Sequence, residues 1–224
     1  MKGTTGEAFD GRTLVIDSAT EACSVALFDG ETLLAGDFRM LGRGHAEALV
    51  PMIAALPDRG RAGRIVVALG PGSFTGVRVG LAAGRALALA WGSNVLGYST
   101  LSLVAAIARD QMAGEGAGAV PIGVAMTGGH GEWFVQAFAA DGTPGNSLAS
   151  LRPDAAAEMV EDVIAGTQAE ALVAARGSGT ALPIWPDARA FPLLPPKALS
   201  ADIRPLYGRA PDARLPGGRP GPQV

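Results

Sequence analysis

Cysteine, histidine and charged residues are all scarce in this chain of 224 residues. It has one cysteine, two histidines and 17% charged residues. A single cysteine cannot form an internal disulfide, so we expect Cys23 to be a small core residue in a reducing compartment. The histidines and carboxylates form no cluster that could complete a metal site. The composition therefore excludes a disulfide scaffold and argues against a bound metal.

Basic clusters and long apolar segments are also missing. The formal net charge is −3 and the sequence pI is about 5.4, so we expect no independent binding to nucleic acid or to an anionic membrane. The longest apolar run, at residues 76–91, is interrupted by arginines and glycines, and no signal-peptide pattern opens the chain. We expect a soluble, cytoplasmic protein. With 48% hydrophobic residues it can bury a sizeable core.

Hydrophobic patterning predicts a βββαβα unit that partly repeats. The first half should contain strands at 14–16, 23–28, 32–38, 65–69 and 94–98, with helices at 42–56, 75–91 and 101–112. The second half should contain strands at 120–126, 132–138, 147–151 and 169–174, with a helix at 153–164. Two facing units of this kind form the α/β fold of actin-like ATPases. We divide the chain into a loose leader (1–12), an N-terminal lobe (13–112), a smaller C-terminal lobe (113–207) and a disordered Pro/Gly-rich tail (208–224).

Two polar turns are candidate phosphate-facing sites. The turn after the first strand carries Asp17, Ser18 and Thr20. In actin-like ATPases the turn at this place contacts phosphate. The second turn is a glycine-rich loop between a strand and a helix N-terminus, a combination that suits anions. Its candidate residues are Gly70, Gly72, Ser73 and Thr75, of which Ser73 or Thr75 can cap the helix. For both turns an ordinary structural role is about as well supported.

The helix at 75–91 has an unusual glycine spacing. Gly76, Gly80 and Gly84 are four residues apart, so one face of the helix lacks side chains. Glycines inside a helix cost about 1 kcal/mol each relative to alanine, so close packing must hold this one. We expect a second helix, from another chain, to lie on the glycine face. The alternative is that this face packs on the protein's own sheet.

The helix at 42–56 carries His45 in its first turn. A metal site on such a helix needs a second histidine four residues later, but Leu49 stands there. We therefore expect His45 to be a capping or interface residue and predict no bound metal.

Five segments together resemble the TsaB (YeaZ) family, the non-catalytic partner subunits in bacterial synthesis of threonylcarbamoyladenosine on tRNA. They are IDSATEACSVALFDG (16–30), His45 ahead of Leu49-Val50-Pro51, GPGSFTGVRVG (70–80), GYSTL (97–101), and Pro205-Leu206-Tyr207 followed by Arg209. The resemblance covers residues 13–105 well and the rest patchily. It implies the actin-like/Hsp70-like fold.

The resemblance also implies a function and a set of partners. The chain would dock a TsaD-like catalytic subunit through its helices at 43–56 and 75–91, and would form a homodimer when alone. A TsaE-like ATPase would join the complex, tRNA would bind only through the complex, and ATP and metal would belong to the partners or their interfaces. The interface residues would be His45, Leu49, Val50, Ile53, Gly76, Arg78, Gly80, Ala83, Gly84 and Leu87.

Two features depart from the family pattern. The run Met126–Glu132 lacks the usual Asp-Ala-Arg before Gly-Glu, and the segment 185–201 is short and proline-rich.

Two other functions remain open. One is a self-sufficient small-molecule kinase or ATPase, which would need a carboxylate pair for a divalent metal. The other is a metalloprotease-like hydrolase, which the lone His45 disfavours.

Overall fold

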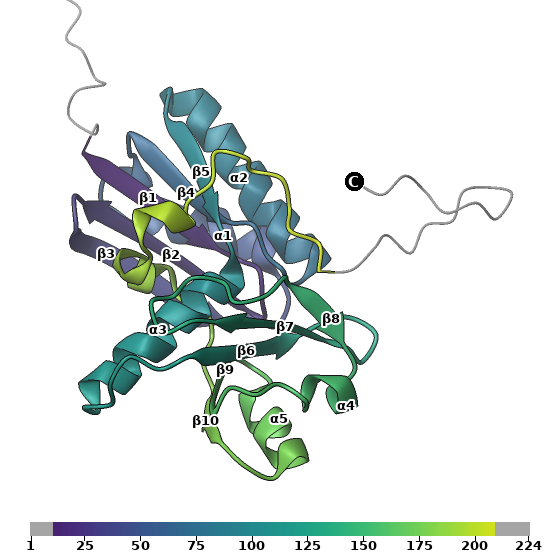
Figure 1. The fold of residues 1–224 in the computed structure, drawn as a ribbon. Helices are drawn as coiled ribbons and strands as arrows, with labels where there is room; N and C mark the ends of the chain where they lie inside the picture. Colours follow the sequence, from purple (N-terminus) through teal and green to yellow (C-terminus); the bar gives the residue numbers. More distant parts are fainter. Residues whose placement is uncertain (1–10, 209–224) are drawn as a thin grey trace, which may run out of the picture.

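The computed structural model describes residues 11–208, which form two lobes, each built on a five-stranded mixed sheet (Figure 1). The predicted leader at 1–12 and the predicted tail at 208–224 fall almost wholly outside the described residues. Within the described range, none of the helices has the length and apolar character that crossing a membrane requires. The α/β class predicted from the sequence is confirmed.

The N-terminal sheet has the strand order β3-β2-β1-β4-β5. Its central strand β1 runs antiparallel to β2 and parallel to β4. Because β1 is covered on both faces, Leu14, Val15 and Ile16 are all fully buried, as a continuous apolar run requires. The strands are β1 (Arg12–Asp17), β2 (Ala22–Asp29), β3 (Thr32–Met40), β4 (Arg64–Ala68) and β5 (Asn94–Tyr98).

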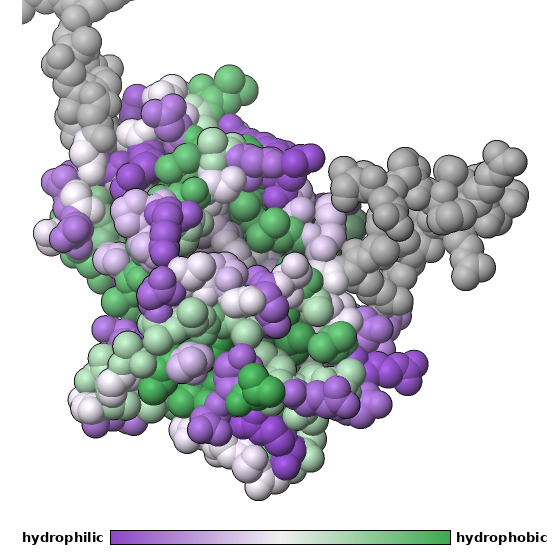
Figure 2. Space-filling view, viewed as in Figure 1, coloured by the Kyte–Doolittle hydropathy of each residue, from purple (hydrophilic) through white to green (hydrophobic). Residues whose placement is uncertain are grey.

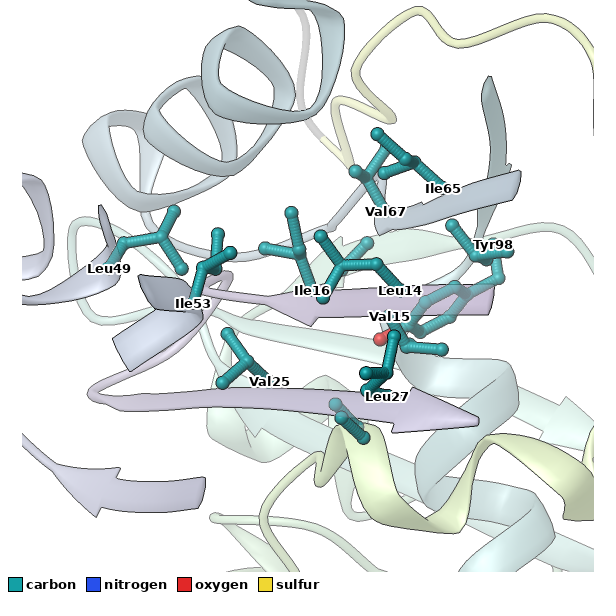
Figure 3. Packing of buried hydrophobic residues seen from close by; sticks show 14 of the residues in the cluster. Leu14, Val15, Ile16, Val25, Leu27, Leu49, Ile53, Ile65, Val67 and Tyr98 are labelled. Carbon is teal, nitrogen blue, oxygen red and sulfur yellow. The ribbon is translucent and has the colours of Figure 1, made fainter. Parts of the chain in front are cut away.

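Two helices, α1 (His45–Ala55) and α2 (Phe74–Trp91), cover one face of this sheet. A short 3-10 turn, η2 (Pro57–Gly60), leads from α1 into β4. Figure 3 shows Leu49 and Ile53 of α1 beside Ile16 and Val25 of the sheet, and all four belong to one hydrophobic core cluster. Leu49 and Ile53 of α1 therefore face the sheet.

The helix α3 (Thr100–Gly114) lies between the two sheets (Figure 1). Leu103 belongs to the hydrophobic cluster of the N-terminal lobe, whereas Leu101 and Val104 belong to that of the C-terminal lobe. Since one helix serves both cores, its rigid packing fixes how the lobes face each other.

The C-terminal sheet has the strand order β10-β9-β6-β7-β8. Its strands are β6 (Ile122–Thr127), β7 (Trp133–Phe138), β8 (Ala149–Leu151), β9 (Val163–Ala165) and β10 (Thr180–Leu182), with helices α4 (Pro153–Ala156) and α5 (Ala169–Arg176). Two predicted elements were wrong. The expected helix at 153–164 ends at Ala156 and its last residues form β9, while the expected strand at 169–174 is α5. The run AEALVAAR was assigned as a strand because it is apolar, but it is rich in alanine, leucine and glutamate, which favour a helix.

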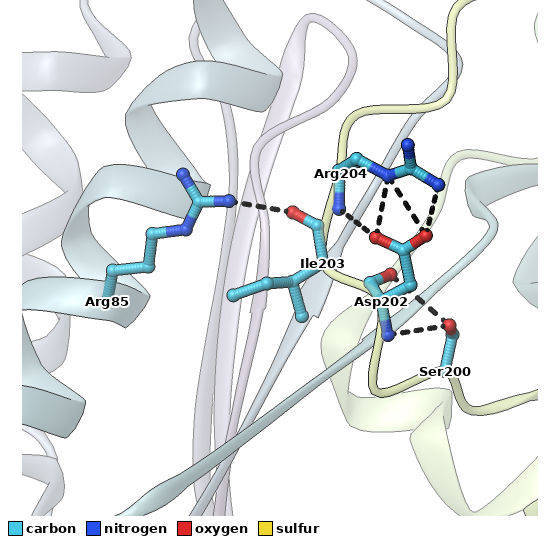
Figure 4. A network of polar contacts seen from close by, with 5 residues as sticks. All are labelled: Arg85, Ser200, Asp202, Ile203 and Arg204. Carbon is cyan, nitrogen blue, oxygen red and sulfur yellow. Dashed lines mark hydrogen bonds and ion pairs between the residues drawn. The ribbon is translucent and has the colours of Figure 1, made fainter. Parts of the chain in front are cut away.

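After β10 the chain returns to the N-terminal lobe through η3 (Ala188–Leu193) and η4 (Pro196–Ala198). Residues 199–208, which we call the C-terminal strap, then run beside β5 and α2, drawn in yellow in Figure 1. The strap pairs with Gly97 through two backbone hydrogen bonds of Ser200, and the Arg85 side chain donates to the Ile203 carbonyl at 3.0 Å (Figure 4). Asp202 and Arg204, on either side of Ile203, form an ion pair at 2.6 Å.

Candidate functional site

The glycine face of α2 lies against the protein's own sheet, so our expectation of a partner helix there was wrong. A Cβ atom added at Gly84 would lie 2.6 Å from Val67 Cγ1, and one at Gly80 would lie 2.6 Å from Ser18 Oγ. At Gly76 it would overlap the carbonyl oxygen of Ser18. The glycines are needed because α2 approaches β1 and β4 too closely for side chains. The same glycine spacing would suit a contact with another helix, so the sequence alone could not distinguish packing on the sheet from packing on a partner helix.

Three other predicted interface residues are also inside the lobe. His45, Leu49 and Ile53 are buried, with Leu49 wholly inaccessible. The His45 Nε2 atom has no hydrogen-bond partner among the described residues, but the apolar Leu49 holds the position of a second ligand. In the described range no group of three His, Cys, Asp or Glu side chains could hold a metal ion. These residues do not fit the metal that a His-x-x-x-His helix would carry.

Among the residues that α1 and α2 expose to solvent are two rows made of alanines and one valine. Val50, in the middle of the row on α1, is 59% exposed. Each row repeats every four residues, so it follows one face of its helix. Ala83 and Leu87, two further predicted interface residues, are half-buried beside them. The exposed rows are Ala46, Val50 and Ala54 on α1, and Ala82, Ala86 and Ala90 on α2.

Asp17 ends β1 in a sealed environment. Its carboxylate accepts the Tyr98 hydroxyl at 2.8 Å and the Ala19 N–H at 3.0 Å, and the residue is 1% exposed. Burial raises the pKa of this carboxyl to about 6, although the two hydrogen bonds lower it. The Ser18 hydroxyl is also buried and donates to the Gly76 carbonyl at 2.9 Å. Neither Asp17 nor Ser18 faces the space where phosphate was expected.

The second turn is partly as predicted. Ser73 caps α2, its hydroxyl accepting the Gly76 N–H at 3.2 Å. Gly72 allows close approach to the turn after β1, where the Ser73 N–H donates to the Ala19 carbonyl at 2.7 Å. Gly70 has a left-handed backbone with φ of 88°. Thr75 is exposed on the first turn of α2.

A cleft of about 750 Å³ opens between the lobes. Its walls are the turn after β1, the N-terminus of α2, the β6–β7 turn and the end of the C-terminal strap. Of the predicted phosphate-facing residues, Thr20, Gly72 and Ser73 line it, whereas Asp17, Ser18, Gly70 and Thr75 do not. Figure 2 shows hydrophobic residues, in green, reaching the surface between the lobes.

The mouth of this cleft holds an aromatic and cationic cluster that the sequence did not predict. The Arg78 guanidinium carbon lies 3.5 Å from the centre of the Phe74 ring, and the same group donates to the Tyr207 hydroxyl at 3.1 Å. Arg78, which we expect at the partner interface, also lines the cleft. Arg78 and Tyr207 are 129 residues apart, so only the fold could reveal the pair.

Comparison with known proteins agrees with this architecture. A family model described as TsaD, tRNA N6-adenosine threonylcarbamoyltransferase, matches residues 39–190. A solved structure from Pseudomonas aeruginosa, described as an uncharacterized protein with similarity to peptidase YEAZ, is 25% identical with a TM-score of 0.74. That match covers 89% of this chain and 100% of the other. A second structure, YeaZ from Pseudomonas aeruginosa, has a TM-score of 0.68 at 24% identity, covering 88% of this chain and 99% of its own, and supports the fold.

Two curated relatives are named tRNA threonylcarbamoyladenosine biosynthesis protein TsaB. The protein from Escherichia coli K12 is 42% identical over 99 residues, which are 42% of each chain. The protein from Haemophilus influenzae is 43% identical over 100 residues, which are 41% of each chain. The chain thus spans about two fifths of the length of the curated relatives that it matches.

Proposed function

This chain belongs to the family whose model is described as TsaD, tRNA N6-adenosine threonylcarbamoyltransferase, and from that premise, together with its curated relatives named TsaB, we propose that it is a TsaB-like, non-catalytic subunit supporting threonylcarbamoyl transfer to adenine 37 of tRNA. Its main partner is a TsaD-like catalytic subunit. A TsaE-like ATPase joins the complex, and tRNA reaches this subunit only through it. Metal and ATP belong to the partners or to their interfaces.

The observation that carries the non-catalytic role is the sealed turn after β1. A kinase or ATPase of this fold needs carboxylates that face the cleft and hold Mg²⁺. Here Asp17 is bonded to Tyr98 beneath the turn. Glu21 is the one Asp or Glu among the described residues that line the cleft, and it accepts the Trp185 indole N–H at 2.7 Å. The kinase-like alternative therefore lacks its chemical groups.

The surface that supports docking is the pair of exposed rows on α1 and α2. Since the glycine face and the buried residues of α1 are engaged with the sheet, we assign the partner contact to these exposed rows instead. Alanines allow another helix to approach closely, and Val50 supplies apolar area to bury. We propose that the isolated chain forms its homodimer through the same rows until the TsaD-like subunit replaces the second copy.

Reconstitution tests this function. Unmodified tRNA and threonylcarbamoyl-AMP are mixed with the TsaD-like and TsaE-like subunits of the same organism, with and without this chain, and modified adenosine is measured by mass spectrometry. We expect modification only when this chain is added, and none from this chain alone. Modification by this chain alone, or an unchanged rate without it, would contradict the proposal.

A further inference from the structure

The cleft between the lobes has the size and lining of a small-molecule site. Its volume of about 750 Å³ lies within the range of roughly 300–1,000 Å³ that ligand pockets occupy. Phe74 is 58% exposed and Tyr207 54% exposed at its mouth, and their ring centres are 6.3 Å apart. Two large aromatic rings left this open to water favour a ligand that covers them.

The hydroxyl groups of the cleft are largely engaged with the protein. Thr127 and Thr167 bond each other at 3.0 Å, and the Ser150 hydroxyl donates to Glu132 at 2.7 Å. Thr20 accepts the Ala22 N–H at 3.2 Å. With these hydroxyls engaged and with Val77, Phe134 and Leu206 in the lining, a ligand with a largely apolar body is favoured.

The charge of the lining selects a small anion. Arg78 is the one lysine or arginine among the described residues that line the cleft. Its guanidinium contacts the Phe74 ring and donates to the Tyr207 hydroxyl, and further N–H donors of its five are left for an anion. A polyphosphate with its Mg²⁺ would need more cations and carboxylates free to hold the metal, and Glu21, the one carboxylate among the described lining residues, is bonded to Trp185. One guanidinium matches one carboxylate or sulfonate.

We propose that the inter-lobe cleft binds a planar aromatic monoanion, with the ring against Phe74 and Tyr207 and the anionic group on Arg78. The cleft is separate from the exposed rows on α1 and α2, so this proposal goes beyond the proposed function. Ligand binding in the cleft and partner docking on the rows can each be disproved without affecting the other. Because Pro205, Leu206 and Tyr207 form one wall, the C-terminal strap must be seated for the site to exist.

The test uses two probes with the same rings and different charge. 1-Anilinonaphthalene-8-sulfonate carries a sulfonate, and N-phenyl-1-naphthylamine does not. Fluorescence titration of the full chain should show one sulfonate probe per chain. Arg78→Gln should weaken the sulfonate probe at least tenfold and change the uncharged probe less than twofold, while Phe74→Leu should weaken both. Arg43→Gln removes an exposed cation that neither lines the cleft nor contacts the C-terminal strap, and should change the affinity for neither probe.

Competition identifies the ligand class. 1-Naphthoate should displace the sulfonate probe, and Mg-ATP at the same concentration should not. Circular dichroism of each variant confirms that it is folded. The proposal is overturned if folded Arg78→Gln binds both probes like the wild type, if Val50→Asp on the docking rows abolishes binding, or if Mg-ATP displaces the probe better than 1-naphthoate.

Discussion

Asp17 is the residue whose environment differs most from what its position suggests. It stands at the end of the central strand, yet it is buried and bonded to Tyr98 and to the Ala19 N–H. Burial raises its pKa to about 6 from 3.8. In the folded state this carboxyl therefore keeps its proton to a higher pH than in the unfolded chain. Its contribution to stability is present at low pH and is lost as the pH rises from about 4 through 6.

We predict that Asp17→Asn stabilises the protein at pH 8 by about 2–3 kcal/mol, at 1.36 kcal/mol per unit of pKa shift. The asparagine stays neutral: its Oδ1 can accept the Ala19 N–H, and its Nδ2 can donate to the Tyr98 hydroxyl oxygen. The advantage should shrink by pH 4.5, where the wild-type carboxyl is protonated in the folded state. Urea unfolding at both pH values measures this. An Asp17→Asn protein that is less stable at pH 8 would mean that the carboxylate itself stabilises the fold.

Cys23 gives a second prediction at the residue scale. It lies in β2 and is fully buried, and burial raises the pKa of its thiol to about 12. Since the thiolate is the reactive form, Cys23 should react with iodoacetamide more than 100-fold slower in the native protein than in 6 M guanidinium chloride. Mass spectrometry of the alkylated chain follows both rates. Equal rates would place Cys23 at the surface.

At the scale of elements, α2 is held by contacts that its glycines permit. We predict that Gly84→Ala destabilises the protein by about 1–3 kcal/mol, because the new Cβ meets Val67 in a packed core. This cost should exceed the gain of about 1 kcal/mol in helix propensity. Gly114→Ala, at a helical glycine in α3 with open space around it, is the control and should be neutral or stabilising. Urea unfolding measures the free energy of unfolding of both variants. A Gly84→Ala protein as stable as the wild type would restore the hypothesis that a partner helix packs on the glycine face of α2.

The same elements show what the sequence could and could not predict. The strand at Asn94–Tyr98 was predicted to the residue because its short apolar run has clear ends. The short elements after Pro153 were assigned wrongly because three-residue strands carry no periodicity. The glycines of α2 correctly predicted a close approach, but the approaching surface comes from β1 and β4. The Arg78–Tyr207 contact joins distant parts of the chain, which no local pattern encodes.

At the scale of the whole molecule, residues 11–208 present two surfaces, on different parts of the fold, to which we assign binding. One is the pair of exposed rows on α1 and α2, on the outside of the N-terminal lobe. The other is the cleft that the two lobes and the C-terminal strap enclose. The chemical groups that an actin-like enzyme would need are buried or bonded within the protein. The exposed rows on α1 and α2 suit the proposed assembly with a catalytic partner.

The most direct test of this account is the affinity of the chain for its TsaD-like partner, measured by calorimetry with two matched variants. Ala86→Glu places a charge on the exposed row of α2 and should weaken binding at least tenfold, about 1.4 kcal/mol, while the chain stays folded. Ala174→Glu makes the same change at an exposed position of α5 on the other lobe and should bind like the wild type. Unchanged binding by folded Ala86→Glu, or equal loss in both variants, would contradict docking through α1 and α2.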